Sequence, residues 1–115
     1  MRKRDKKIEN AICQALTDVC ETALESYAGF SWLTHRVDYQ RFPDSLLVIC
    51  VFDNNAALTQ FIAQGHDRDL SALIQQHLAK QQIVLKQPKR QISFDSEENC
   101  QQSHQGNWQA RLAKH

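Results

Sequence analysis

Hydrophobic residues in the first quarter of the chain recur at the spacing of one helix face. Over residues 7–27 they fall at i, i+3 and i+4 intervals: Ile8, Ile12, Ala15, Leu16, Val19, Cys20, Ala23, Leu24 and Tyr27. Acidic side chains and a glutamine occupy the other face, as expected for a surface exposed to solvent. The pattern predicts an amphipathic helix over residues 7–27, followed by Gly29 as the stop signal.

From Phe30 the hydrophobic period becomes that of a strand. The residues of one side are Leu33, His35, Val37 and Tyr39, and those of the other are Trp32, Thr34, Arg36 and Asp38. A turn at Pro43, Asp44 and Ser45 leads into residues 46–52 (LLVICVF), which are apolar on both faces. We therefore expect a hairpin whose second strand is central and covered by helices.

The rest of the chain alternates short helical and extended patterns. We predict helices over residues 56–64 and 67–81, an extended segment from residue 83, a basic bend over 86–90, a third strand over 92–94, and helical segments over 97–103 and 108–112.

The resulting order, α-β-β-α-α-β-α, indicates an α+β fold. We expect a small three-stranded sheet, antiparallel or mixed, with helices packed on it, because each helix must bury one stripe. KH-like domains and the amino-terminal domain of RimP-type ribosome maturation factors have the same order, which is an analogy of topology alone. The 115 residues are enough for one core, so we expect a single domain over residues 1–115.

Composition favours a cytoplasmic protein. The sequence has no apolar run with the features of a signal peptide or the length of a transmembrane helix, so no membrane contact is expected. The four cysteines are not arranged in a CxxC pattern, and we expect Cys13, Cys20, Cys50 and Cys100 to be free thiols. Of these, Cys13 lies off the apolar stripe, and the sequence indicates no partner for it.

The charge is divided unevenly along the chain. The first seven residues carry five basic side chains and one acidic side chain, a net +4, whereas the remaining nine basic and twelve acidic residues give −3. We interpret residues 1–7 as a basic amino-terminal arm that contacts a phosphate-bearing partner. The alternative is a solvated start of the first helix. The basic residues concerned are Arg2, Lys3, Arg4, Lys6 and Lys7.

Aromatic and basic side chains also meet on the first strand. Trp32 and Arg36 share one face of it, as a sheet-borne nucleic-acid surface requires. The basic bend adds Lys86, Lys89 and Arg90 to the candidate binding residues. The alternative for Trp32 is ordinary packing under a helix.

A different hypothesis arises from the densest cluster of acid, base and ligand groups, between Asp95 and His104. Cys100 and His104 are four residues apart, so one helix face would present both to a metal ion, although a structural zinc site needs four ligands. Asp95, Glu97 and Glu98 supply carboxylates for acid–base chemistry or, alternatively, for capping a helix. No catalytic motif or phosphate-binding glycine loop is present, and we expect no cofactor.

Three segments carry a resemblance to a known family: RKRDKKIENAICQALTDVCETALE, GFSWLTHRVDYQRFPDSLLVICVFDNN and ISFDSEENCQQSHQGNWQARL. They resemble a small gammaproteobacterial family that is often labelled Fis-like transcriptional regulator, a label that implies DNA binding but no particular site residues. A Fis protein ends in a basic helix-turn-helix. Here Gly106 and Asn107 interrupt the corresponding segment, so we still expect the α+β fold.

The leading hypothesis is thus a non-catalytic, cytoplasmic binding module whose partner is a nucleic acid or a protein. The alternative is a small metal-dependent or carboxylate-based enzyme built around residues 95–104. A homodimer formed through an exposed sheet edge is compatible with either.

Overall fold

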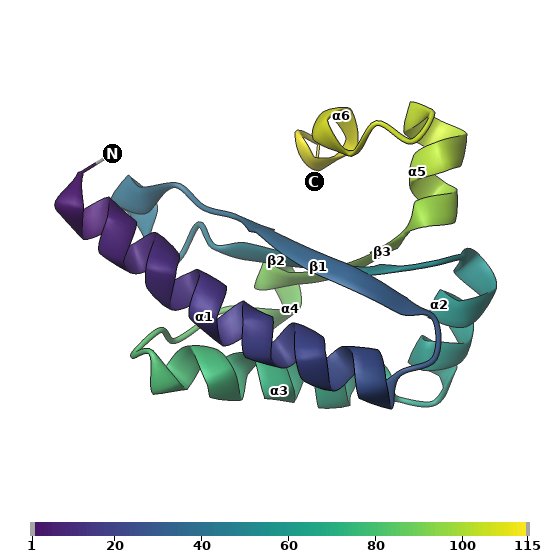
Figure 1. Ribbon diagram of the computed structural model, residues 1–115, viewed down its shortest axis with the longest axis horizontal. Coiled ribbons are helices and arrows are strands. Elements are labelled where there is room, and N and C mark those ends of the chain that lie inside the picture. Colours follow the sequence, from purple (N-terminus) through teal and green to yellow (C-terminus); the bar gives the residue numbers. More distant parts are fainter. Residues whose placement is uncertain (1, 115) are drawn as a thin grey trace.

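The protein, described over residues 2–114 by a computed structural model, has the predicted α+β architecture and element order (Figure 1). Its helices are α1 (Lys3–Ser26), α2 (Asn55–Ala63), α3 (His66–Lys80), α4 (Pro88–Gln91), α5 (Glu97–His104) and α6 (Trp108–Leu112), with a 3-10 turn, η1 (Tyr39–Arg41). Its strands are β1 (Phe30–Arg36), β2 (Leu47–Phe52) and β3 (Ile92–Ser96). No helix of the described residues is both long and apolar enough to cross a membrane.

The amino-terminal basic cluster belongs to α1. The helix begins at Lys3, so the separate arm expected over residues 1–7 is wrong for Lys3 through Lys7. Lysine and arginine have high helix propensity, and the buried stripe that follows stabilises the whole helix. Arg2 is extended at the N-cap position, and Met1 lies outside the described residues.

The sheet is mixed, one of the two arrangements predicted. β2 is central: it pairs antiparallel with β1, with Leu33 opposite Cys50, and parallel with β3, with Cys50 opposite Phe94. The parallel pair is made by the crossover through α2 and α3, because strands that run in the same direction cannot be joined by a tight turn. β3 continues to Ser96, two residues beyond the predicted strand.

α1 and α3 cover one face of the sheet (Figure 1). The core is formed by the apolar stripes of both helices and the alternate residues of β2 that point toward them. Its central residues are Ile12, Leu16, Val19, Val48, Cys50, Phe52, Leu70, Ile74 and Leu78. The predicted apolar strand is therefore the middle of the core.

The carboxyl-terminal helices lie over the opposite face of the sheet (Figure 1). Ile49 and Val51 of β2 point to that side by strand alternation, and both are fully buried. The sheet is thus enclosed from two sides, which explains why residues 46–52 are apolar on both faces.

Candidate functional site

The shortest helix, α4, is fixed to the end of the hairpin by one buried glutamine. The side-chain amide of Gln91 donates to the carbonyl oxygens of Pro43 at 2.9 Å and Leu46 at 3.0 Å. Its Oε1 accepts from the backbone N–H of Gln87 at 3.0 Å. Pro88 occupies the start of the helix, where its missing N–H has no cost. The predicted basic bend is therefore an anchored helical turn.

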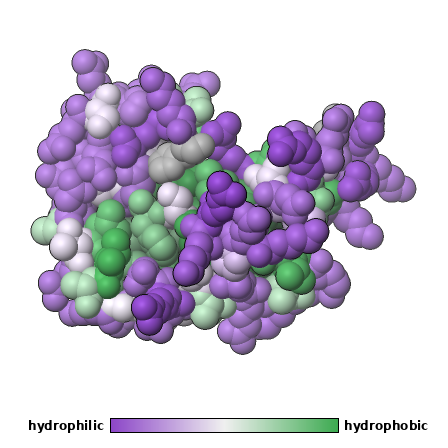
Figure 2. All heavy atoms as spheres, turned by 180° about the vertical axis from the view of Figure 1, so that it is seen from behind, coloured by the Kyte–Doolittle hydropathy of each residue, from purple (hydrophilic) through white to green (hydrophobic). Residues whose placement is uncertain are grey.

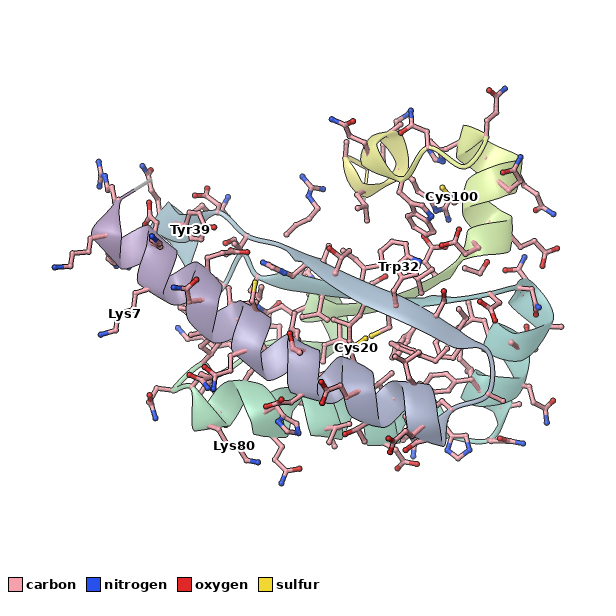
Figure 3. The ribbon with its side chains drawn as sticks, in the orientation of Figure 1. Lys7, Cys20, Trp32, Tyr39, Lys80 and Cys100 are labelled. Atoms are coloured by element: carbon pink, nitrogen blue, oxygen red, sulfur yellow. The ribbon has the colours of Figure 1, made fainter. Side chains whose placement is uncertain are left out.

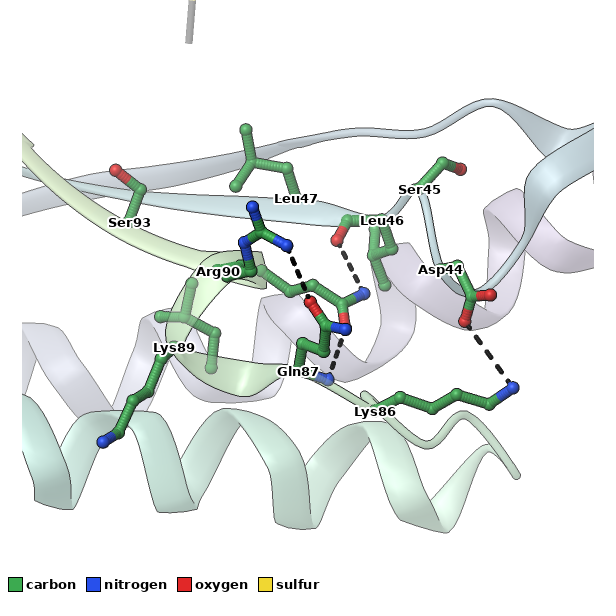
Figure 4. A pocket seen from close by; sticks show the side chains of 11 residues that line it. Asp44, Ser45, Leu46, Leu47, Lys86, Gln87, Lys89, Arg90 and Ser93 are labelled. Carbon is green, nitrogen blue, oxygen red and sulfur yellow. Dashed lines mark hydrogen bonds and ion pairs between the residues drawn. The ribbon is translucent and has the colours of Figure 1, made fainter.

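A hollow of about 560 Å³ lies between α4, the start of β2 and the start of β3 (Figure 4). Lys86, Lys89 and Arg90 all line it, so the structure brings these three predicted residues together. Nζ of Lys86 lies 3.9 Å from Oδ1 of Asp44. Both side chains are largely exposed, so this ion pair contributes little to stability. Arg90 donates to the side chain of Gln87 at 3.3 Å, whereas Lys89 extends toward α3 (Figure 4).

A second hollow, of about 950 Å³, lies between α3, α4 and β3. The two hollows share Gln87, Lys89, Arg90 and Ile92, and we call the combined surface the α4 groove. α3 contributes Arg68, and β3 contributes the half-buried Phe94. The charged side chains of the groove are Arg68, Lys86, Lys89 and Arg90 against Asp44 and Asp67.

Hydrophobic side chains are also exposed on the side of the molecule that faces away from the viewer in Figure 1. Figure 2 shows them gathered in a patch bounded by hydrophilic residues. In the groove itself, the half-buried ring of Phe94 lines the second hollow together with Lys89 and Arg90. An aromatic ring beside cationic groups suits a ligand that has both flat rings and negative charges.

Trp32 and Arg36 line neither hollow of the α4 groove and contact the carboxyl-terminal helices instead, although the exposed Arg36 adjoins Ser45 and Leu47, which also line the first hollow. The indole of Trp32 donates to Glu97 Oε1 at 2.6 Å and meets the ring of Trp108 edge to face, with centroids 4.8 Å apart. Trp108 in turn donates to Glu97 Oε2 at 3.1 Å, and Arg36 donates to the carbonyl oxygen of Leu112. Trp32 thus takes part in the packing that was the alternative interpretation of it (Figure 3).

The carboxylates between Asp95 and His104 are engaged in holding that same segment. Asp95 is paired with Arg111, and Glu98 accepts from the backbone N–H of Asn55 at 2.8 Å. The Cys100 thiol is fully buried, and this burial raises its pKa. The imidazole Nδ1 of His104 lies 3.4 Å from Nη1 of Arg111. These contacts attach α5 and α6 to β3 and to the start of α2.

The basic turns of α1 lie apart from the α4 groove. Figure 1 places the start of α1 at one end of the long axis and α4 near the middle of the molecule. The described part of α1 begins with no side-chain cap, and Asp5 is the acidic residue of its first turn. Basic charge at a helix amino terminus is unfavourable to the helix itself.

One cluster was missed by the sequence analysis. Glu9 and Cys13 of α1 meet His35 of β1, with donor atoms that all lie within 4.8 Å of one another. Glu9 and Cys13 are four residues apart, and His35 was predicted on the apolar side of its strand. If the first helix had been expected to pack on the apolar side of the strand, the contact of Glu9 and Cys13 with His35 could have been predicted.

The hydroxyl of Tyr39 completes this cluster. It donates to Glu9 Oε2 at 2.6 Å, while the imidazole Nε2 of His35 lies 2.7 Å from Glu9 Oε1. The hydrogen bond to Glu9, with burial, raises the pKa of Tyr39 to about 12. Figure 3 shows Tyr39 beside the amino-terminal half of α1.

Comparison with known proteins identifies no relative of this chain. No family model, no curated protein and no solved structure matches the chain. The resemblance to the Fis-like family therefore stays a prediction.

Proposed function

We propose that this protein is a non-catalytic binding module that holds single-stranded nucleic acid in the α4 groove. The observation that carries the proposal is the meeting of two hollows at Lys89 and Arg90, beside an aromatic side chain and an open sheet edge. Of the two partners left open by the sequence, a nucleic acid or a protein, the proposal takes the nucleic acid. Of the candidate binding residues, it keeps those of the basic bend and leaves out Trp32 and Arg36.

The charges of the groove favour a polyanionic partner. Four cationic side chains against two carboxylates give it a positive balance, although the chain as a whole carries only +1. Lys89 and Arg90 line both hollows, and neither has a carboxylate among its hydrogen-bond or ion-pair partners in the described part of the chain. Cationic side chains without a carboxylate partner suit a phosphate backbone, because their contact with phosphates releases condensed counterions.

The third strand lies at an edge of the sheet, beside the groove. β3 is an edge strand, and its middle residues Ser93 and Phe94 are only half-buried, so we assign the contacts with base edges to the outer backbone groups of these two residues. Phe94 of the same strand lines the hollow and offers a ring face for stacking. A duplex buries its base faces, so this combination favours a single strand.

The order of elements supports the same function by analogy. KH-like domains, which have this order, bind single-stranded nucleic acid and clamp its backbone with a GxxG loop between two helices. Here the connection between α2 and α3 carries Gly65 but no GxxG. We therefore assign the phosphate contacts to Lys89, Arg90 and Arg68.

The test is fluorescence anisotropy of labelled single-stranded RNA and DNA of mixed sequence, measured over a range of salt concentrations. The double variant Lys89→Glu/Arg90→Glu is expected to bind at least about tenfold more weakly and to lose about 1.4 from the salt slope, for two phosphate contacts. The matched control is Lys3→Glu/Lys7→Glu, which changes the net charge equally in the amino-terminal turns of α1, apart from the groove.

Two outcomes would overturn the proposal. One is that the wild-type protein binds neither nucleic acid at low salt, including the case in which it binds only an acidic polypeptide. The other is that the control loses as much affinity as the groove variant, which would assign binding to the amino-terminal turns of α1.

A further inference from the structure

The cluster of Glu9, Cys13 and His35 has the geometry of three metal ligands. The sulfur of Cys13 lies 3.6 Å from Glu9 Oε1, and the imidazole nitrogen of His35 lies 2.7 Å from the same oxygen. Tetrahedral Zn²⁺ with ligands at 2.0–2.3 Å requires donors about 3.4 Å apart. The sulfur is already near that spacing from Glu9 Oε1, and all three donor atoms lie within 4.8 Å of one another, so side-chain rotations of Glu9 and His35 can bring them to the spacing an ion requires.

The chemistry of the donors selects the ion. A thiolate, an imidazole and a carboxylate together suit a borderline transition metal, whereas Mg²⁺ and Ca²⁺ prefer oxygen ligands alone. The Glu9 and His35 side chains are 28% and 16% exposed, so they are partly withdrawn from water but remain reachable.

Tyr39 orients the carboxylate for this role. Its hydroxyl holds Oε2 of Glu9, which directs the other oxygen, Oε1, toward Cys13 and His35. Hydrogen bonds of this kind fix the orientation of a ligand and are typical of the outer shell of metal sites.

A hollow of about 320 Å³ opens beside Cys13 and His35. It is lined on its other sides by Leu16, Thr17, Cys20, Glu21, Leu33 and Thr34. The hollow gives an ion a path of entry and leaves room for water as a fourth ligand.

We propose that Glu9, Cys13 and His35 form a binding site for one Zn²⁺ ion per chain, oriented by Tyr39. On binding, the Cys13 thiol releases its proton to solvent and coordinates as thiolate. The ion joins α1 to β1, two elements that contact each other at this point through the side chains of Glu9 and His35. The site is separate from the α4 groove, so either proposal can fail without the other.

Titration of the chelator-treated, full-length protein with Zn²⁺ against a chromophoric chelator tests this site. We expect one ion per chain, and Co²⁺ in its place is expected to give a thiolate-to-metal charge-transfer band. Cys13→Ser and His35→Gln are each expected to weaken binding at least about tenfold, and Cys13→Ser to abolish the band. Tyr39→Phe is expected to weaken binding about tenfold while the band is retained.

The matched control is Cys20→Ser, which removes a thiol that lines the same hollow outside the ligand cluster. It is expected to retain wild-type affinity. Circular dichroism of each metal-free variant establishes that it is folded, and the melting temperature of the wild type, but not of Cys13→Ser, is expected to rise with Zn²⁺. Absence of stoichiometric Zn²⁺ binding to the wild type, or equal losses in Cys20→Ser and Cys13→Ser, would refute the site.

Discussion

The carboxylate of Asp95 accepts two hydrogen bonds from the guanidinium of Arg111, at 2.6 Å from Nε and 2.9 Å from Nη2. Asp95 belongs to β3 and is 2% exposed, whereas Arg111 belongs to α6. The pair therefore connects the carboxyl-terminal helices to the sheet. The hydrogen bond with Asp95 has the largest influence on the pKa of Arg111, and it raises that pKa.

Arg111→Ala is expected to lower the free energy of unfolding by about 3–5 kcal/mol, because it removes the guanidinium from a buried carboxylate. Urea denaturation followed by tryptophan fluorescence measures the change. Arg41→Ala, at an exposed arginine of η1, is the control and should stay within about 0.5 kcal/mol of wild type. A loss below about 1 kcal/mol in Arg111→Ala would mean that this pair does not hold the segment in place.

Gly29 and Gly65 both have a positive φ, +82° and +77°, but they differ in how much space surrounds them. A Cβ at Gly29 would lie 2.4 Å from the Cβ of Ala57, whereas at Gly65 it would meet nothing within 4 Å. We expect Gly29→Ala to be less stable than Gly65→Ala by about 1–3 kcal/mol, the cost of overpacking. Thermal unfolding of both variants measures this difference, and equal losses would contradict the close contact between Gly29 and α2.

The buried thiols give a prediction about reactivity. Burial raises the pKa of Cys50 from 9.0 to about 12 and also raises that of Cys100. The thiolate fraction of Cys50 at neutral pH is then about a thousandfold lower than in an exposed cysteine. In native, metal-free protein, a disulfide reagent should modify neither Cys50 nor Cys100, and both should react once denaturant is added. Mass spectrometry of the peptides identifies the modified residues; rapid native labelling of Cys50 would contradict a closed core.

Phe94 allows a test of stacking in the α4 groove. Phe94→Leu keeps apolar bulk against Phe61, whose ring centroid is 5.6 Å away, but removes the aromatic face. We expect single-strand affinity to fall by about 1–3 kcal/mol, which is roughly 5- to 150-fold. Phe42→Leu, a half-buried phenylalanine outside the groove, is the control and should bind as wild type. Equal binding by Phe94→Leu and wild type would exclude a stacking role for this ring.

Most of the fold could be predicted because helices and strands leave different periods in the sequence. The stripe from Ile12 to Ala23 and the two-sided apolar run that became β2 depend on residues within a few positions of one another. The parallel partner of β2 could not be chosen in advance, because antiparallel and mixed sheets suit the same local patterns. The start of α1 was misplaced because charged residues are compatible with both an arm and a helix.

The sequence by itself determined the α+β class, the order of the elements, the central position of β2 and the cationic character of residues 86–90. Only the tertiary structure decided what the polar side chains do. Trp32 meets Glu97 across 65 positions of the chain, and His35 meets Glu9 across 26. Contacts at such separations depend on how whole elements pack, and the spacing of residues within one element does not determine which side chains of two elements meet. For the same physical reason, the α4 groove and the Glu9–Cys13–His35 cluster emerged only when the helices were seated on the sheet.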